Sequence, residues 1–419
     1  MSSIFLFHAK MKTASFLFTP FARQTCVGVL GLITLAAMPS ASASGTRVGF
    51  KDAFAMARGN AFVATANNPS AVYYNPAGLT QLSGQRLTAS VYDIALKSDY
   101  RSGTGETSMD DSYQPVPQIF YSFRPDNGSR LAYGIGVYAP FGLSTKWSDN
   151  SPLRTFALKN EQTYLTFNLS TAYQLTQNIS IGGGLTYNKV TTELSRAIGV
   201  FGPNDLFRFK GDGHAVGYTL GAMWRPSLKH SFGASYQANT SVKMKGTTDT
   251  IPLVTGEPSD ATFEFPEVLI LGYSYRPTPL WNFEVNVDWT NWNRLNTVTI
   301  NKASGAQPLP FNWESGFFYE FGVTHYLTSN WNISAGYLYT ENSTPDSTYT
   351  PAVPDSDRHF YSIGVGYTSG NLGANLAWHY ADGGTRTVSG SPPSLIGATA
   401  DGIYKNSLNA LALSLEWRF

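Results

Sequence analysis

The amino-acid sequence predicts an all-β transmembrane protein whose fourteen antiparallel strands close into a barrel. Apolar and polar residues alternate along many short segments, as they do in strands with one oily face. The connections between these segments alternate between short and long. Charged residues make up only 14% of the chain and aromatic residues another 14%, whereas a soluble domain is about a quarter charged. The mean hydropathy of −0.16 fits a barrel, because lipid-facing and lumen-facing residues cancel in the average.

The first 43 residues have the features of a secretory signal peptide. Basic residues precede an apolar stretch from Cys26 to Ala37, and small residues follow up to Ala43. This stretch is too short and wrongly flanked for a membrane anchor. We expect a signal peptide over residues 1–43 with cleavage after Ala43, and Met11 offers an alternative start. Because Cys26 is the only cysteine, the mature chain has no disulfide or thiol chemistry.

Residues 44–85 differ from the rest of the chain. They are rich in Ala, Asn and Gly and contain no period-two run. A segment of this kind ahead of a barrel is either a periplasmic extension or a plug inside the lumen. Low charge and small side chains suit a plug, but composition alone leaves both readings open.

The barrel is expected to begin at residue 86 and to run to residue 419 as a series of amphipathic strands. In the segment 281–293, tryptophan, phenylalanine and valine residues share one face, while Asn282, Glu284 and Asp288 share the other. The fourteen expected strands span residues 86–97, 116–124, 130–138, 162–175, 178–195, 214–225, 230–243, 263–276, 281–293, 315–327, 330–340, 359–368, 371–381 and 406–419.

The lengths of the connections favour a membrane barrel over a soluble sandwich. Six short turns and seven long loops alternate strictly along the expected strands. Barrels with short periplasmic turns and long outer loops produce this pattern, and both chain ends then lie in the periplasm. Closure also leaves no strand edge unpaired in lipid.

The last expected strand ends on an aromatic residue, Phe419. The outer-membrane insertion machinery of Gram-negative bacteria is generally taken to recognise such an end. We therefore expect an outer-membrane location, Phe419 as the insertion signal, and contact with membrane lipid and lipopolysaccharide. We expect a monomer. A net charge of +1 argues against a nucleic-acid partner.

Several short motifs, in a fixed order, resemble those of the FadL family of outer-membrane transporters for long-chain fatty acids and other hydrophobic compounds. An N-terminal Gly49-Phe50 is followed by an Asn-Pro-Ala-Gly element. The remaining motifs are Tyr138-Ala139-Pro140-Phe141-Gly142, Phe265-Pro266-Glu267-Val268, Thr290-Asn291-Trp292 and Pro354-Asp355-Ser356-Asp357-Arg358.

The resemblance implies a fourteen-stranded barrel plugged by an N-terminal hatch, which favours the plug for residues 44–85. It also implies passive transport. A hydrophobic molecule would be caught by outer loops, pass to a pocket within the barrel, and leave sideways beside an inward kink in the third strand. The turn of the hatch would be formed by Asn75, Pro76, Ala77 and Gly78, and Gly134 and Gly136 would lie at the lateral opening.

The candidate ligand-binding residues come from this resemblance and from two apolar loops. Dense exposed apolar residues mark an interaction surface, although these loops could simply pack on each other as a lid. Arg196 falls where the family has a pocket arginine that would meet a carboxylate. Glu314 stands where the family has a second cation, so a neutral ligand fits as well. The expected ligand-binding residues are Phe50, Phe141, Leu143, Trp147, Phe156, Arg196, Val200, Phe201, Phe207 and Glu314.

Other functions are weighed against this one. The histidines lack metal-ligand spacing and no residue is marked as a nucleophile, so we expect no enzyme activity, no metal and no cofactor. A diffusion porin for polar solutes, an aromatic-hydrocarbon channel of the same family, and an adhesin or phage receptor remain alternatives. High conductance in planar bilayers would favour the porin.

Overall fold

The computed structural model describes residues 45–110, 113–125 and 128–419. The expected signal peptide, residues 1–43, lies outside these ranges. No helix in the described part of the chain is long and apolar enough to span a membrane.

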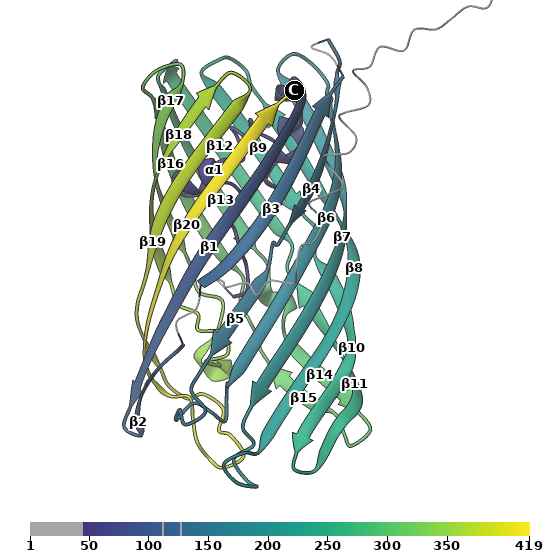
Figure 1. The fold of residues 1–419 in the computed structure, drawn as a ribbon, viewed down its shortest axis with the longest axis vertical. Helices are drawn as coiled ribbons and strands as arrows, with labels where there is room; N and C mark the ends of the chain where they lie inside the picture. Colours follow the sequence, from purple (N-terminus) through teal and green to yellow (C-terminus); the bar gives the residue numbers. More distant parts are fainter. Residues whose placement is uncertain (1–44, 111–112, 126–127) are drawn as a thin grey trace, which may run out of the picture. The chain divides into compact units, whose positions relative to one another are not determined.

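A closed wall of fourteen antiparallel strand positions confirms the predicted barrel (Figure 1). The first and last strands pair from Arg86↔Arg418 to Arg101↔Ile403, which closes the ring. Three positions are each filled by two consecutive strands. In chain order the wall consists of β1 (Gly84–Ser102), β3 (Tyr113–Arg124), β4 (Leu131–Tyr138) with β5 (Gly142–Lys146), β6 (Lys159–Gln174), β7 (Ile179–Arg196), β8 (Leu206–Trp224), β9 (His230–Gln237) with β10 (Thr240–Ile251), β11 (Val254–Phe265) with β12 (Val268–Thr278), β13 (Trp281–Thr290), β16 (Gly316–Tyr326), β17 (Trp331–Thr340), β18 (Arg358–Ser369), β19 (Leu372–Val388) and β20 (Gly402–Arg418).

The strands run further into the long loops than the sequence predicts. β8 begins at Leu206 instead of 214, and β19 continues to Val388 instead of 381. We call this end of the barrel, at the bottom of Figure 1, the long-loop end. Short strands β2 (Gly105–Ser108), β14 (Thr297–Lys302) and β15 (Gln307–Pro310) and single turns η3 (Trp292–Arg294) and η4 (Asp346–Thr348) lie in the loops at this end.

Apolar and polar side chains alternate along β13, and this alternation shows why the strand suits the wall of a membrane barrel. Phe283, Val285 and other apolar side chains on one face are exposed on the outside of the barrel, while Glu284 and Asp288 on the other face are buried. Buried carboxylates are costly unless they are paired. The inner face of the wall therefore needs polar partners within the lumen.

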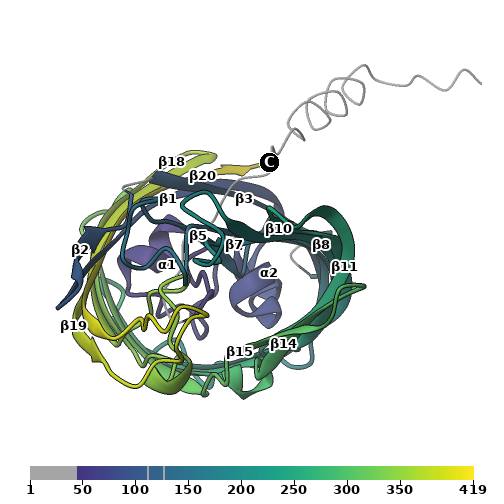
Figure 2. The same cartoon turned by 90° about the horizontal axis from the view of Figure 1, so that it is seen from below.

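Residues 45–82, which we call the hatch, lie inside the ring of strands (Figure 2). They contain α1 (Ala53–Ala57), α2 (Ala71–Tyr74) and the 3-10 helix η2 (Pro76–Gln81). Asp52 caps α1 by accepting a hydrogen bond from Ala55 N at 3.1 Å. The wall begins directly afterwards at Gly84, two residues before the predicted start.

The hatch supplies the partners for the acidic inner face. The Arg47 guanidinium lies 2.6 Å from the Asp288 carboxylate, and both side chains are fully enclosed. Arg58 pairs with Glu284 at 3.1 Å, and Asn60 donates to Glu320 at 2.7 Å. These contacts join the hatch to β13 and β16.

Wall glycines make room for the hatch backbone. A side chain at Gly336 would place its Cβ 1.9 Å from Gly59 N. The Asn-Pro-Ala-Gly turn fits in the same way against Gly182 and Gly221, where a Cβ would meet the backbone of Ala77 or the side chains of Asn75 and Pro76.

Candidate functional site

A cavity of about 220 Å³, the main cavity, lies at the long-loop end. Its lining combines strands β5, β7, β8 and β11 with residues of the loops. Most of the side chains are apolar, as in sites for hydrophobic ligands. They include Leu143, Phe156, Phe207, Phe265, Trp292 and Trp313.

Arg196, at the end of β7, lines the main cavity as the sequence predicts. Its guanidinium carbon lies 5.7 Å from the centre of the Phe207 ring. Among the described residues its side chain has no ion-pair or hydrogen-bond partner. A guanidinium in this position can bind a carboxylate by donating hydrogen bonds to it, because a buried anion needs a cationic partner.

Lys302, at the end of β14, provides a second cation that sequence reasoning missed. Its Nζ lies 5.6 Å from the same Phe207 ring and 3.8 Å from the Glu257 carboxylate. Both Lys302 and Arg196 line a second cavity of about 100 Å³. A signal was available, because Val298, Ile300 and Lys302 share one face of a period-two run.

Glu314 does not lie at the site. Its side chain is exposed, and its backbone N–H donates to Ser343 O at 2.8 Å. The neighbouring Trp313 lines the main cavity instead. The prediction placed Glu314 in the position of a second cation, whereas the cation beside Phe207 is Lys302, from the same connection between β13 and β16.

Four buried side chains that line the main cavity carry hydrogen-bond donors without partners among the described residues. The groups are the indole N–H of Trp292 and of Trp313, the amide Nδ2 of Asn160 and the hydroxyl of Tyr349. Buried polar groups are normally paired. A ligand with an oxygen acceptor would satisfy such donors, whereas a plain hydrocarbon would not.

Phe141, Leu143 and Trp147 are buried, contrary to their expected role as an exposed capture surface. Phe141 packs on Tyr164 and Phe265, with ring centres 5.2 Å apart in both pairs. Trp147 donates from its indole to Pro351 O at 2.9 Å. The loop turns into the barrel, so these side chains form its packed interior.

Exposed apolar residues do lie beside the second cavity, on two other loops. Val200 and Phe201 are 55% and 49% exposed, and Leu395 and Ile396 are 77% and 54% exposed. Ile396 packs over Gly199, and Leu395 lines the second cavity. We call these four residues the mouth patch; the sequence predicts its first two members.

Phe50 lies away from the main cavity, in a hatch cavity of about 20 Å³. Its ring is 5.5 Å from Tyr92 and 4.6 Å from His379. Asn75 fixes the turn of the hatch, because its side chain accepts from Ala77 N and donates to Val63 O and Ala222 O. Gly78 is required there, since a Cβ would lie 2.3 Å from Ala66 O.

The third strand position is interrupted between β4 and β5, where the chain turns inward onto the hatch. Val48 N donates to Pro140 O at 2.8 Å, and Gly142 N donates to Thr46 O at 2.7 Å. β5 then pairs with β6 alone. The ladder between β3 and β4 ends at Ile119↔Val137, so Pro115 and Pro117 have no ladder partner on this side within the described chain.

This interruption leaves a gap in the hydrogen-bond ladder of the wall, and the gap is bounded at both ends. The ladder stops at Ile119↔Val137 on one side and resumes at the Met109↔Trp147 bridge on the other. We call the gap between residues 113–118 and 139–145 the wall window. Six residues of strand span about 20 Å.

The structure places the interruption at Ala139–Phe141 rather than at Gly134 and Gly136. Both glycines lie in the regular β4 ladder. A Cβ at Gly134 would lie 2.5 Å from Val72, and one at Gly136 would lie 2.9 Å from Phe120. These glycines make room for the hatch and for an inner-wall ring.

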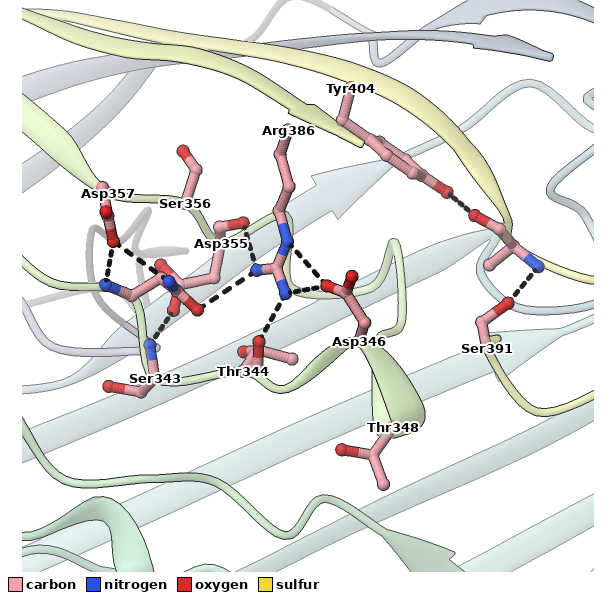
Figure 3. A network of polar contacts seen from close by, with 12 residues as sticks. Ser343, Thr344, Asp346, Thr348, Asp355, Ser356, Asp357, Arg386, Ser391 and Tyr404 are labelled. Atoms are coloured by element: carbon pink, nitrogen blue, oxygen red, sulfur yellow. Dashed lines mark hydrogen bonds and ion pairs between the residues drawn. The ribbon is translucent and has the colours of Figure 1, made fainter. Parts of the chain in front are cut away.

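An arginine-centred network holds the loop over the main cavity (Figure 3). Arg386 donates to Asp346 Oδ1 at 2.6 Å and to Asp355 O at 3.0 Å. Its guanidinium also lies 4.9 Å from the ring of Tyr349, which lines the cavity. Asp357 accepts from Asn342 N at 2.8 Å, which ties the two ends of the loop between β17 and β18 together, and Arg386 joins that loop to β19.

Comparisons with known proteins agree with this architecture. The family model described as outer membrane protein transport protein (OMPP1/FadL/TodX) matches residues 34–419. The long-chain fatty acid transport protein of Escherichia coli is 24% identical over 358 residues, covering 73% of this chain and 78% of that protein. An outer membrane protein of Neisseria meningitidis is 24% identical over 476 residues, covering 96% of this chain and 100% of its own.

Solved structures share the fold. A Pseudomonas aeruginosa FadL homologue aligns with a TM-score of 0.81 at 19% identity, covering 90% of this chain and 100% of its own. The toluene transporter TodX of Pseudomonas putida aligns with a TM-score of 0.72 at 17% identity, covering 88% and 98%.

Proposed function

The chain belongs to the outer membrane protein transport protein family (OMPP1/FadL/TodX), and on this premise we propose that it takes up long-chain fatty acids and similar amphiphiles. Members of this family are transport barrels of the outer membrane and not enzymes. Transport is passive in this proposal, because concentration differences alone move the ligand.

The observation that carries the proposal is the cation without a partner beside an apolar cavity. A fatty acid brings an apolar chain and one carboxylate. The main cavity offers aromatic and aliphatic walls for the chain, and Arg196 and Lys302 flank Phe207 at its edge. A charge-assisted hydrogen bond is shorter and stronger than a neutral one, so the carboxylate is the group most favoured there.

The donors without partners favour an oxygen-bearing ligand over a hydrocarbon. Leaving a buried donor unpaired costs about 1–3 kcal/mol. A carboxylate, ester or alcohol can accept from Trp292, Trp313, Asn160 or Tyr349, all of which line the main cavity.

The proposed transport route has three sites. The mouth patch first holds the apolar chain, the main cavity binds the whole ligand, and the wall window releases it sideways into the membrane. Leu143 connects the main cavity with the wall window, because it lines the cavity and belongs to β5, which borders the window. The hatch stays in place during this route.

A second candidate is the uptake of aromatic hydrocarbons. The aromatic lining of the main cavity supports it, and the fold neighbours include a toluene transporter. A diffusion porin is disfavoured, because the hatch residues inside the ring are almost all buried.

Cellular placement completes the proposal. Residues 1–43 are removed as a signal peptide, the hatch acts as the plug up to the start of the wall at Gly84, and the barrel functions as a monomer. The insertion machinery of the outer membrane recognises Phe419, and both ends of the mature chain lie in the periplasm. The exposed apolar outer wall supports contact with lipid and lipopolysaccharide.

Binding to purified protein in detergent tests the ligand class. We expect saturable binding of oleate, weaker binding of oleyl alcohol, and no measurable binding of toluene. In Arg196→Ala we expect oleate to bind roughly tenfold to a hundredfold more weakly, as for losing a charged hydrogen bond of about 1.5–3 kcal/mol. The alcohol should lose much less.

Arg101→Ala is the matched control, because Arg101 is an exposed arginine at the same end of the barrel and outside the cavity lining. Unchanged oleate binding in Arg196→Ala would remove Arg196 from its role. Toluene binding tighter than oleate binding would favour the hydrocarbon channel.

A further inference from the structure

We propose that Pro115 and Pro117 keep the wall window permanently open, because they give β3 an edge that cannot pair. This inference rests on the proposed lateral release of ligand. It assigns a positioning role to two residues that do not touch the main cavity. The wall is then a fixed aperture, and any gating belongs to the loops or the hatch.

The first step is that β3 is paired on one side only along the window. Its residues pair with β1 along the whole strand, from Gly84↔Arg124 to Ala95↔Tyr113. On the other side the ladder covers Ile119 to Phe123 alone. Pro115 and Pro117 thus lie on a strand edge within the described chain, a feature that closed barrels normally remove.

The second step is the direction in which the prolines face. Pro115 lies opposite Asp93, and Pro117 lies opposite Val91. In an antiparallel ladder, alternate residues direct their N–H and C=O to the same neighbour. Proline has no N–H and is accepted only where that position points away from the partner strand. Both prolines therefore face away from β1 and towards the window.

The third step is what would pair there without the prolines. The observed register joins residue 119 to 137 and residue 123 to 133. Continued by two residues at a time, it would place Pro117 opposite Ala139 and Pro115 opposite Phe141. Proline removes both N–H donors that this extension needs. Because proline has no backbone N–H, the unpaired edge also lacks two donors that would otherwise face lipid without a partner, each at a cost of several kcal/mol in free energy.

The opposite side of the window is held away by the hatch. Pro140 O accepts from Val48 N, and Phe141 bridges to Arg47 instead of to β3. On the β3 side, Gln118 donates from Nε2 to Phe50 O at 3.1 Å. Both sides of the window are therefore joined to hatch residues 46–50.

The position of the prolines within the fold is distinctive. In the described strands the other prolines are Pro258, Pro277, Pro308 and Pro310. Pro258, Pro308 and Pro310 lie in the extensions or small strands at the long-loop end, and Pro277 lies next to a short turn. Pro258 is likewise paired on one side only, so what sets β3 apart is that its two prolines border the break between β4 and β5.

The test replaces both prolines by a residue that can pair. Pro115→Thr/Pro117→Thr restores two N–H donors in residues with high strand propensity. We expect oleate delivery into cells that lack their own importer to fall roughly tenfold, equivalent to about 1.4 kcal/mol on the release step. Oleate binding to the purified variant should stay unchanged. The new amides at 115 and 117 should be protected from hydrogen exchange.

Pro258→Thr is the matched control, since Pro258 is an exposed strand proline far along the chain from the window. It should leave delivery unchanged. If the double variant does not fold, Pro117→Thr alone decides, because it extends the ladder by one step from Ile119. Wild-type delivery in a folded variant, or reduced delivery with freely exchanging amides, would overturn the inference. Absence of oleate binding in the unmodified protein would instead contradict the proposed function.

Discussion

At the scale of single residues, Arg196 and Lys302 differ in how far the sequence reveals them. Arg196 ends a clear strand and falls where the resemblance places a pocket arginine, so its position could be predicted. Lys302 belongs to β14, a short strand in a long loop, and reaches Phe207 only through the fold of that loop. The burial of Phe141 and Trp147 could not be predicted either, because an apolar loop has the same sequence pattern whether it faces solvent or turns into the barrel.

Asp205 orders one half of the mouth patch. Its carboxylate accepts four backbone hydrogen bonds, from Ile198, Gly199, Val200 and Phe201, at 2.8–3.0 Å. Burial of the carboxylate would raise its pKa, but the four hydrogen bonds outweigh this and lower the pKa of Asp205 below its ordinary value. Because its pKa is lowered in the folded loop, ionised Asp205 stabilises the loop fully above the pKa of the unfolded chain, about 3.9. This stabilisation is lost as the pH falls through the pKa of the folded state.

We therefore predict that Asp205→Asn speeds hydrogen exchange of the amides of residues 198–201 at neutral pH and weakens capture of oleate. In the unmodified protein these amides should stay protected from pH 8 down to about pH 4 and lose protection below that. Asp149→Asn, on a neighbouring exposed loop, is the control. Equal exchange in both variants would show that the carboxylate does not order the loop.

At the scale of elements, the strands of the wall could be predicted from residue patterns, whereas a hatch was expected from the family resemblance alone. Period-two alternation, imposed by lipid on one side and polar lumen on the other, identifies all fourteen wall positions. Strand ends were missed at the long-loop end, because pairing continues there after the alternation of apolar residues has weakened. The hatch has no periodicity, since its residues pack against the wall on every side.

A signal for the hatch does exist within the wall. Glu284, Asp288 and Glu320 face the lumen at full burial, and buried carboxylates require cations or donors. Arg47, Arg58 and Asn60 of the hatch are those partners. Acidic residues on the lumen face of clear strands can thus indicate that something basic fills the barrel.

Steric fit between hatch and wall gives a prediction at this scale. In Gly336→Ala the new Cβ would lie 1.9 Å from Gly59 N, so the hatch has to move. We expect a loss of about 1–3 kcal/mol in stability, as for overpacking. We also expect the single-channel conductance in planar bilayers to rise above that of the unmodified barrel, which we expect to be near zero.

Gly373→Ala is the control for this change, because a Cβ in that wall strand would meet its nearest neighbour at 3.6 Å. The same stability and conductance in Gly336→Ala as in the unmodified protein would mean that the hatch does not pack there as described.

At the scale of the whole molecule, three features act on one ligand. The barrel encloses a lumen and the hatch residues lie inside it; in the proposed function the hatch blocks this lumen and the wall window releases the ligand sideways. The loop network around Arg386 holds Tyr349 over that cavity. The proposed ligand, an apolar molecule with an oxygen head group, matches the apolar lining and the donors of the main cavity.

A structure of the protein bound to oleate tests this account most directly. We predict the acyl chain among the aromatic rings of the main cavity, the carboxylate within hydrogen-bonding distance of Arg196, and the hatch in its present place. An empty main cavity at saturating oleate, or a hatch displaced from the barrel with an open lumen, would contradict it.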